Sequence, residues 1–424
     1  AIADSKVYSV LPNNGDGDFT FDRASTATRV GQNGLIETVA IDLPRLNYDI
    51  SNGVVQSCPS LLLEPASTNL FPYSEDFSQS PWVKSKVTIT SNSALSPDGT
   101  LNASKILETT GSLNGHFILE SLGLTENITY NFSVFVKKLN RKYVGLQNSY
   151  NSNNGSIAFF DLDNETIIYT FSDGDSGRVF SVSNAKIQSV GNGWLRLSAN
   201  FQSNVVGDSV VPTLVISNSQ WSTGFSYNNP YEGDPTKGVY AWGAQIEALS
   251  YATSYIPTLS GAIQTRAVES AEVVNKPILN ASTQFTLFFN SKDFCLINGR
   301  TTGSFADSQF ILGAGTSPYN TGTGIHIYSN VWYFFNGSSA VSLGICYNVR
   351  SDSKFAISYD GTKYTKYANG VKLGDFTVAA SMSNWDTITT GALIDGSGNI
   401  RIWNLKDLRV YNTALTDAEL IALT

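Results

Sequence analysis

The chain has 424 residues, of which 42% are hydrophobic and only 15% are charged. A single hydrophobic core stops growing at roughly 250–300 residues, so we expect two or three domains. Lys and Arg total 27 against 35 Asp and Glu, and no basic stripe is present, which disfavours nucleic-acid binding. No apolar run approaches the roughly 18 residues that cross a bilayer, so we expect no membrane span.

We expect neither a disulfide framework nor a secretion signal. Cys58, Cys295 and Cys346 are odd in number and widely spaced, which is typical of buried thiols rather than of a disulfide framework or a zinc site. Residues 1–7 lack the charged leader and the apolar core of a signal peptide.

Residues 1–70 form a polar, proline-interrupted segment that cannot hold a core alone, so we expect it to pack on a neighbouring unit. Its stretch Asp-Arg-Ala-Ser-Thr-Ala-Thr-Arg at 22–29 is echoed by Gln-Thr-Arg-Ala-Val-Glu-Ser at 264–270, and we expect the N-terminal segment to pair with residues 264–270. The oxygen-rich loop at 13–18 offers Asp16 and Asp18 as ligands for a structural calcium ion. An ordinary Asp-Gly turn is the alternative.

Residues 71–275 alternate apolar and polar side chains with a period of two, the pattern of β-strands. The run 239–247 puts Trp242 on the same face as Ala244 and Ile246, which predicts that Trp242 lies in the core. Many short strands between Asn, Gly, Asp and Ser turns are typical of antiparallel β-sandwiches and jelly rolls.

A sugar-binding surface needs an exposed aromatic ring beside planar polar side chains, because sugars offer apolar C–H patches rimmed by hydroxyls. Alternation along the strands turns a set of such side chains away from the predicted core. We expect the set to line one open sheet face, and its members are Phe135, Tyr143, Gln147, Trp194 and Arg196. The alternative is that the N-terminal segment or another subunit covers this face.

Residues 281–424 form another strand-rich unit. The run 324–333 turns His326 and Tyr328 away from its isoleucines, which makes both of them further glycan-binding candidates. At the end of the chain, Thr416 precedes Glu419 by three residues, a capping box that predicts one short C-terminal helix. The predicted fold class is all-β, with two tandem antiparallel β-sandwiches and this one helix.

No catalytic motif stands out. Sugar hydrolases place two carboxylates across the scissile bond, but the pair Asp173 and Asp175 has Gly and Ser neighbours that indicate a turn. The same two residues are weak calcium candidates, and no other cofactor is expected. His116 and His326 lie outside any nucleophile motif. A lyase site assembled from Tyr, Arg and His stays open.

Three parts of the chain resemble known families. Phe-Asp-Arg-Ala-Ser-Thr-Ala-Thr-Arg-Val at 21–30, Gly-Leu-Ile-Glu at 34–37, Pro-Arg-Leu-Asn-Tyr at 44–48 and Cys-Pro-Ser-Leu-Leu-Leu-Glu-Pro at 58–65 resemble a segment of phage structural and fibre-like proteins. The middle unit, which opens with Asn-Leu-Phe-Pro-Tyr-Ser-Glu-Asp-Phe at 69–77, is similar to jelly-roll carbohydrate-binding modules.

The last unit resembles the laminin-G and concanavalin-like lectin superfamily. The likeness is carried by Tyr-Asp-Gly-Thr at 359–362, Tyr-Ala-Asn-Gly at 367–370 and Val-Tyr-Asn-Thr-Ala-Leu-Thr-Asp-Ala at 410–418. The resemblances imply a phage-type segment at 1–70 that packs on a neighbour or anchors to the virion, a jelly roll at 71–275 and a lectin-like sandwich at 281–424. They specify fold more than ligand.

These resemblances imply a phage virion surface protein, a fibre, spike or capsid-decorating component, that adheres to host-surface glycans without catalysis. Its expected partners are other virion proteins and host glycans. By analogy with fibres we expect a homotrimer, which would turn weak single-site affinity into avidity. The alternatives are a purely structural virion protein that binds no sugar, and a polysaccharide depolymerase or a secreted bacterial polysaccharide-binding protein from a prophage-like locus.

Overall fold

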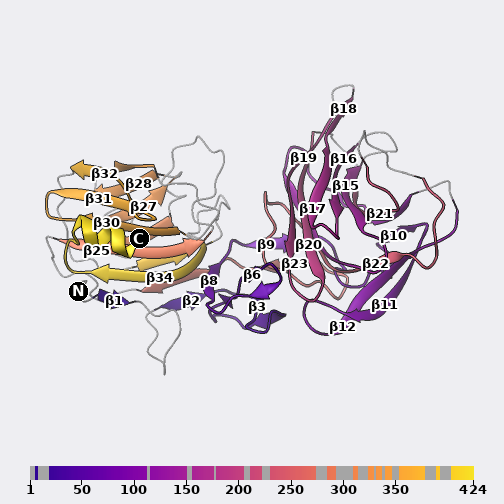
Figure 1. The fold of residues 1–424 in the computed structure, drawn as a ribbon, viewed down its shortest axis with the longest axis horizontal. Helices are drawn as coiled ribbons and strands as arrows, with labels where there is room; N and C mark the ends of the chain where they lie inside the picture. The colour runs from indigo at the N-terminus through magenta and orange to yellow at the C-terminus, as the bar shows by residue number, and fades with distance from the viewer. Residues whose placement is uncertain are drawn as a thin grey trace.

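The computed structural model shows two β-rich lobes with strands of the N-terminal segment between them (Figure 1). It describes residues 5–7, 19–111, 115–149, 155–175, 178–204, 211–221, 230–273, 284–292, 309–313, 323–328, 331–336, 340–345, 353–377, 388–391 and 403–424. Among these residues one helix, α1 (Asp417–Leu423), accompanies the strands, so the predicted all-β class is confirmed. In the described ranges no helix has the length and apolar character to cross a bilayer.

The larger lobe is a sandwich of two antiparallel sheets. The six-stranded sheet consists, in spatial order, of β10 (Val83–Ser85), β13 (His116–Leu119), β21 (Val211–Ser217), β15 (Tyr143–Ser149), β16 (Gly155–Asp161) and β17 (Thr166–Phe171). The seven-stranded sheet consists of β11 (Val87–Leu95), β12 (Leu101–Glu108), β22 (Gly238–Glu247), β14 (Tyr130–Lys138), β20 (Trp194–Ser203), β19 (Arg178–Ser189) and β18 (Asp173–Asp175). Because alternate side chains of each strand point inward, Val134, Leu146 and Leu197 are fully buried between the sheets.

One predicted core residue lies on the other face of its strand. Gly243 adopts a φ of +63°, and the register between β14 and β22 shifts at this place. Such a bulge interrupts the alternation of side chains. Ala244 and Ile246 therefore pack between the sheets, while Trp242 packs on the outer face against Tyr255. The prediction that Trp242 is a core residue is confirmed by its burial, but the prediction that it shares a face with Ala244 and Ile246 is wrong.

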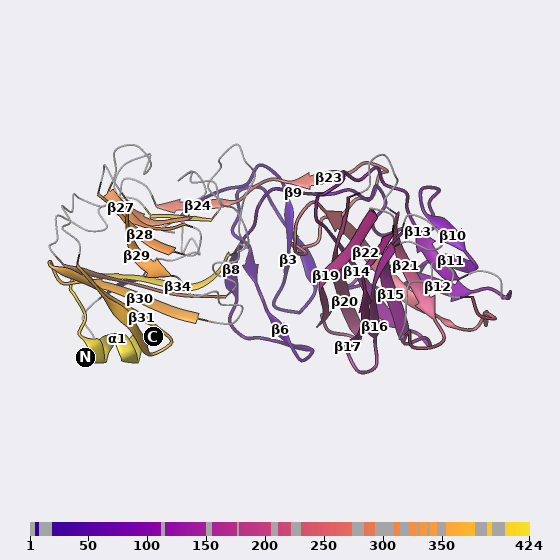
Figure 2. The ribbon, with the colours of Figure 1, turned by 90° about the horizontal axis from the view of Figure 1, so that it is seen from above.

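The other lobe is also a sandwich (Figure 2). One layer is a sheet of β32 (Val371–Thr377), β31 (Lys363–Ala368), β30 (Ser353–Tyr359), β25 (Phe285–Lys292), β34 (Trp403–Tyr411), β8 (Ser60–Leu63) and β5 (Leu46–Asn47), with β1 (Ser5–Val7) beside β34. The opposite layer contains β26 (Gln309–Gly313), β27 (Thr323–Tyr328), β28 (Val331–Asn336) and β29 (Ala340–Ile345), and a second sheet of β2 (Thr20–Asp22), β24 (Ser270–Val273) and β33 (Ile388–Gly391). The two sandwiches follow one another along the chain, as predicted.

Local signals at the end of the chain are confirmed. The Thr416 side chain accepts from Glu419 N, and the Glu419 carboxylate accepts from Thr416 N at 2.8 Å, so both halves of the capping box are present. Leu420 and Leu423 then seal the outer face of the sheet that contains β30. Asn369 and Gly370, both with positive φ, join β31 to β32 in a two-residue hairpin turn.

The N-terminal segment belongs to both lobes. Its β9 (Ser67–Asn69) pairs with β23 (Gln264–Arg266), and β2 pairs with β24, so the expected pairing with residues 264–270 is confirmed. Its β5 and β8 extend a sheet of the second sandwich. Two small hairpins, β3 (Ala27–Val30) with β4 (Ile36–Val39) and β6 (Ile50–Ser51) with β7 (Val54–Val55), lie between the lobes (Figure 2).

A buried network of arginines and glutamates fixes this segment. The Glu269 carboxylate accepts from Arg23 Nη1 at 2.6 Å, from Arg45 Nε at 2.8 Å and from the backbone N of Glu64 at 3.0 Å. The Glu64 carboxylate pairs with Arg45 Nη1 at 2.9 Å and with Arg266 Nη1 at 3.0 Å. All five side chains are buried, so each charge is matched where water does not reach.

The network makes the fold sensitive to acid. Burial by itself would raise the pKa of the Glu64 carboxyl, but the charges of Arg266 and Arg45 outweigh it and lower the pKa to about 2, against 4.5 for a free carboxyl. The stability that ionised Glu64 contributes is therefore complete above pH 4.5, and it is lost as the pH falls toward 2.

We expect Glu269→Gln to destabilise the chain by about 3–5 kcal/mol, because Arg23 and Arg45 then stay buried without this countercharge. Glu37→Gln is the matched control: it breaks an ion pair with Arg29 whose side chains are 28% and 43% exposed, at a cost below about 1 kcal/mol. Urea unfolding followed by tryptophan fluorescence measures both variants. Equal midpoints for the two would contradict the stabilising role of the network.

Candidate functional site

The structure separates the five side chains expected on one sheet face. Phe135, Trp194 and Arg196 lie on the outer face of the seven-stranded sheet, whereas Tyr143 and Gln147 lie on β15 of the six-stranded sheet. Alternation identifies the outward side of a strand but not the sheet that the strand joins. The prediction of one shared face is wrong.

The two aromatic residues on the seven-stranded sheet are covered. Phe135 is 2% exposed and Trp194 is 1% exposed, and both pack in a cluster with Trp242 and Tyr255. The N-terminal segment contributes Ile36 to this cluster, and Trp194 Nε1 donates to a backbone oxygen at 3.0 Å. Ile36 of the N-terminal segment, together with Tyr255 and other residues of the sandwich, covers these rings, so they are not open sugar platforms.

The candidates on the six-stranded sheet are enclosed to different degrees. Gln147 is fully buried, and neither atom of its amide has a hydrogen-bond partner. Tyr143 is partly exposed and stacks on Phe159 with ring centroids 6.3 Å apart. Trp221 stacks on Phe159 at 5.1 Å and closes much of the same face. Of the two predicted residues, Tyr143 keeps part of its side chain in contact with solvent, whereas Gln147 does not.

The remaining candidates form no site in the part of the chain that the structure describes. His326 and Tyr328 belong to β27, but their side chains lie outside the described part, as do Asp16 and Asp18. Asp173 lies in a strand, β18, rather than in the expected turn, and the side chain of its neighbour Asp175 is not described. Among the described residues no group of three His, Cys, Asp or Glu is placed to hold a metal ion.

The cysteines give one correction. Cys58 is an exposed free thiol, so the prediction of a buried thiol is wrong for this residue. It lies in the bend between β7 and β8 of the N-terminal segment, where its side chain is exposed. Cys295 and Cys346 lie outside the described residues.

A cleft runs along the outer face of the seven-stranded sheet, where the N-terminal segment meets the larger sandwich. It has two adjoining parts with volumes of about 400 Å³ and about 340 Å³, within the range of known ligand sites. Both parts share Gln188, Arg196 and Ala252. The two parts adjoin at Arg196, a residue predicted from the sequence, and we treat them together as the candidate site.

Strand register builds the floor of the cleft. On neighbouring strands Gln188 lies opposite Arg196, which lies opposite Phe135. Further along, Lys186 lies opposite Ser198 in the same sheet. The face changes from aromatic near Phe135 to polar toward the other end of the strands. Residues 252–255 form one wall, and residues 28–30 and 47–50 of the N-terminal segment form the other.

The floor holds hydrogen-bonding atoms that the protein leaves unused. Asn131 Nδ2 donates to Asn200 Oδ1 at 2.7 Å, but the buried Asn131 Oδ1 has no partner. Arg196 Nη1 donates to Thr253 O at 2.7 Å and Nη2 to Ser133 Oγ at 3.0 Å, but the buried Nε has no partner. A buried polar group without a partner costs about 1–3 kcal/mol. A polar ligand would remove part of that cost.

Burial lowers the pKa of the Arg196 guanidinium, and the charges of Glu247 and Glu64 oppose this effect. Arginine nevertheless keeps its charge at any ordinary pH. Sequence reasoning placed Arg196 on the outward side but missed Asn131, Lys186 and Gln188. These three residues could have been found only by predicting which strands are neighbours and then comparing the side chains that share one face of the sheet.

A cluster of Tyr, His, Arg and Glu side chains lies elsewhere in the same sandwich. Glu108 accepts from Arg141 Nε and from Tyr231 Oη, both at 2.6 Å, and the Tyr231 ring stacks on His116 at 4.3 Å. Burial, with the Glu108 carboxylate, raises the pKa of the Tyr231 phenol far above its usual value. Asp234 N also donates to Glu108 at 2.9 Å, so the cluster fastens the loop that precedes β22.

Comparison with known proteins bears on the fold alone. No protein-family model and no curated protein matches the chain. Domain 4 of an extracellular arabinanase from Geobacillus stearothermophilus, solved with arabinotriose, is 16% identical over 37% of this chain and 72% of its own, with a TM-score of 0.29. The binding domain of botulinum neurotoxin serotype G is 14% identical over 37% of this chain and 42% of its own, with a TM-score of 0.28.

Laminin domains give a similar result. Domains LG4-5 of the mouse laminin α1 chain are 9% identical over 72% of this chain and 90% of their own, with a TM-score of 0.24. Similarity this low identifies neither a ligand nor an activity. The resemblance of residues 21–65 to phage proteins stays a prediction.

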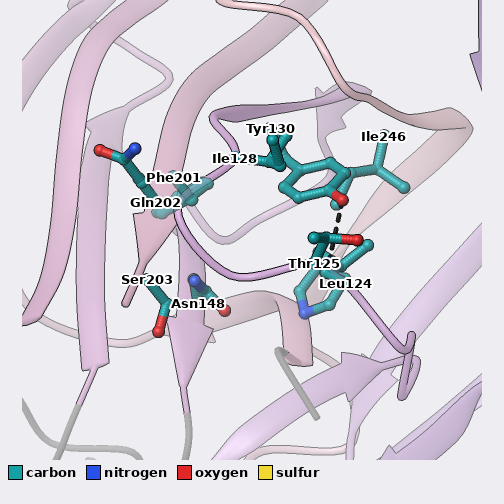
Figure 3. A pocket seen from close by; sticks show the side chains of 10 residues that line it. Leu124, Thr125, Ile128, Tyr130, Asn148, Phe201, Gln202, Ser203 and Ile246 are labelled. Carbon is teal, nitrogen blue, oxygen red and sulfur yellow. Dashed lines mark hydrogen bonds between the residues drawn. The ribbon is translucent and has the colours of Figure 1, made fainter. Parts of the chain in front are cut away.

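A small cavity lies at one end of the larger sandwich (Figure 3). Its volume of about 10 Å³ suits one water molecule rather than a sugar. Thr125 N donates to Tyr130 Oη at 3.0 Å in its wall, and Asn148 contributes an amide without a partner on either atom. Nearby, Glu120 N donates to the backbone oxygen of Pro212, which lines the cavity.

Glu120 is a buried acid with an unpartnered oxygen, Oε2, and burial raises its pKa to about 7. The folded pKa lies above the free value of 4.5, so stability is complete below pH 4.5 and declines as the pH rises through 7. We expect Glu120→Gln to remove this decline. With a discount for partial water access, the gain at pH 8 is on the order of 1–2 kcal/mol.

Urea midpoints of wild type and Glu120→Gln at pH 4 and pH 8 measure the effect. The two proteins should match at pH 4, where the carboxyl is protonated in both folded and unfolded chains, and the variant should be more stable at pH 8. If the urea midpoints of the two proteins changed equally between pH 4 and pH 8, ionisation of Glu120 would cost the folded state no stability.

Proposed function

We propose that the chain is a bacteriophage virion surface protein that adheres to host glycans through the cleft, without catalysis. The phage origin is supported by the motifs within residues 21–65. The observation that carries the glycan part is the pair of buried, unpartnered atoms in the cleft floor, Arg196 Nε and Asn131 Oδ1. Sugar hydroxyls both donate and accept, so they complement such atoms.

The fold holds the floor and one wall of the cleft in place, which favours the binding of a sugar. Its floor is a paired β-sheet, and one wall is held by the buried network through Ser254, which donates to both Glu64 oxygens. A preorganised wall reduces the ordering cost that a ligand must offset. Presentation on a homotrimer, by analogy with fibres, would multiply a modest single-site affinity.

Support for adhesion rather than hydrolysis comes from the carboxylates that line the cleft. A glycosidase needs one carboxyl with a raised pKa to protonate the leaving oxygen. Glu64 has a pKa lowered to about 2 and is held by two arginines, so it cannot serve as that acid. The other lining carboxylate, Asp49, lies in the N-terminal segment.

A purely structural role is the second candidate, and one observation favours it. The aromatic side chains expected to form an open sugar platform, Phe135 and Trp194, are buried beneath residues that include Ile36 and Tyr255. In this alternative the two sandwiches act as packing modules of the virion, and the cleft binds nothing.

The test is a glycan array followed by titration of each hit with wild type, Gln188→Ala and Gln264→Ala. Both glutamines are exposed, so neither change should disturb the fold. Gln188 lines the cleft and Gln264 lines a different groove. We expect Gln188→Ala to weaken binding roughly 3- to 10-fold, the worth of one hydrogen bond, and Gln264→Ala to leave it unchanged.

The outcomes separate the candidates. Binding that Gln188→Ala leaves intact would move the sugar site away from the cleft. No binding by the wild type to any glycan would leave the structural role as the better account.

A further inference from the structure

One arginine beside the cleft has no carboxylate close by. Three arginines and three glutamates near the cleft are buried, Arg23, Arg45, Arg266, Glu64, Glu247 and Glu269, and the partly exposed Arg196 adds a fourth cation. Three of the arginines have a carboxylate oxygen close by: Arg23 to Glu269 at 2.6 Å, Arg45 to Glu64 at 2.9 Å and Arg266 to Glu64 at 3.0 Å. Within the described residues, Arg196 has no ion pair of this kind.

Arg196, in the cleft floor, is thus the arginine of this set that forms no ion pair with a carboxylate of the described residues. A guanidinium has five N–H groups, and the two hydrogen bonds of Arg196 both go to neutral oxygens, those of Thr253 and Ser133. The group also lies 5.1 Å from the centre of the Phe135 ring, which reduces its contact with water. A partly desolvated cation with unused donors favours an anionic ligand.

Glu247 and Glu64 favour the charged form of Arg196 but bind other groups directly, and Asp49 also lines the cleft. Glu247 accepts hydrogen bonds from Ser67 Oγ, Gln245 Nε2 and the backbone N of Thr253, at 2.6, 2.7 and 3.0 Å. Its oxygens are thus occupied by neutral donors rather than by Arg196. Glu64 is already shared by Arg45 and Arg266.

Resting on the glycan-binding function proposed above, we propose that the cleft takes an oligosaccharide whose sugar residues carry carboxylates, with one carboxylate against Arg196. A planar carboxylate can accept two parallel hydrogen bonds from a flat guanidinium. The exposed Lys186 lines the same cleft and adds a second cation. Gln188 offers an amide opposite Arg196.

The length of the site indicates an oligosaccharide rather than a single sugar. Asn131 lies four positions along β14 from Phe135, the residue opposite Arg196. Four strand residues span roughly 13 Å, so a ligand that reaches both Arg196 and Asn131 Oδ1 extends over more than one sugar ring. Asn131 Oδ1 then accepts from a hydroxyl further along the ligand.

The experiment compares hexuronate oligosaccharides with the same oligosaccharides after carboxyl reduction, which removes the charge and keeps each sugar's stereochemistry. Binding to the wild type is measured by calorimetry. We expect at least about tenfold tighter binding of an acidic form than of its reduced form. The difference should shrink when NaCl is raised from about 0.05 M to about 0.5 M, because salt screens the exposed part of the attraction.

Two variants locate the anion. Arg196→Gln should abolish the preference for the acidic form, with its unfolding midpoint measured because Arg196 also holds residues 133 and 253. Lys186→Gln changes an exposed residue and should reduce the preference roughly threefold. Lys354→Gln, exposed on the other lobe, is the matched control and should leave the preference unchanged.

The carboxylate inference fails separately from the proposed function. Equal affinity for acidic and reduced forms, with both weakened by Gln188→Ala, would overturn the carboxylate inference and keep glycan binding in the cleft. A stronger response to sulfated than to carboxylated oligosaccharides would overturn it too, as would a preference that survives both Arg196→Gln and Lys186→Gln. No binding to any form would overturn both proposals.

Discussion

The buried arginine–glutamate network holds together parts of the chain that have little apolar surface to share. Residues 19–70 are polar and interrupted by proline, so hydrophobic burial cannot fix them alone. Instead Arg45 and Glu269, 224 positions apart in the sequence, hydrogen-bond each other in the interior. Desolvating such charges is costly, and the network offsets this cost only because nearly every donor finds an acceptor. Removing one partner therefore lowers the free energy of unfolding by much more than the small net contribution of each intact pair.

The network also gives the motifs within residues 21–65 a physical role. Arg23 comes from the motif at 21–30, Arg45 from that at 44–48 and Glu64 from that at 58–65. The echo at 264–270 supplies Arg266 and Glu269. Motifs that carry no catalytic residue thus carry the charges that seat the N-terminal segment against the sandwiches. Charged residues that hold two parts of a chain together are expected of a structural module, in whichever particle or cell it occurs.

Much of the fold could be predicted because its signals are local. Alternation identified strands and inward faces, and Thr416 with Glu419 identified the one described helix. The errors come from non-local or backbone features. The bulge at Gly243 turned Trp242 to the other face, and no side-chain pattern announces a single positive φ. Phe135 and Trp194 do point outward, but their exposure depended on Ile36 and Tyr255, which only the folded chain brings over them.

The cleft is a consequence of the same packing. Residues 252–255 and the hairpin strands of the N-terminal segment cover the aromatic end of the outer sheet face, and they leave the polar end open beside them. The backbone oxygen of Thr253 accepts from Arg196, while the Thr253 side chain accepts from Arg266 at 3.0 Å. One residue of the wall thus touches both the paired cations and the unpaired one. The sequence could predict that Arg196 points outward, but it could not show that the carboxylates of Glu64 and Glu247 bind other groups. This arrangement of charges suits the cleft to the acidic ligand that we propose.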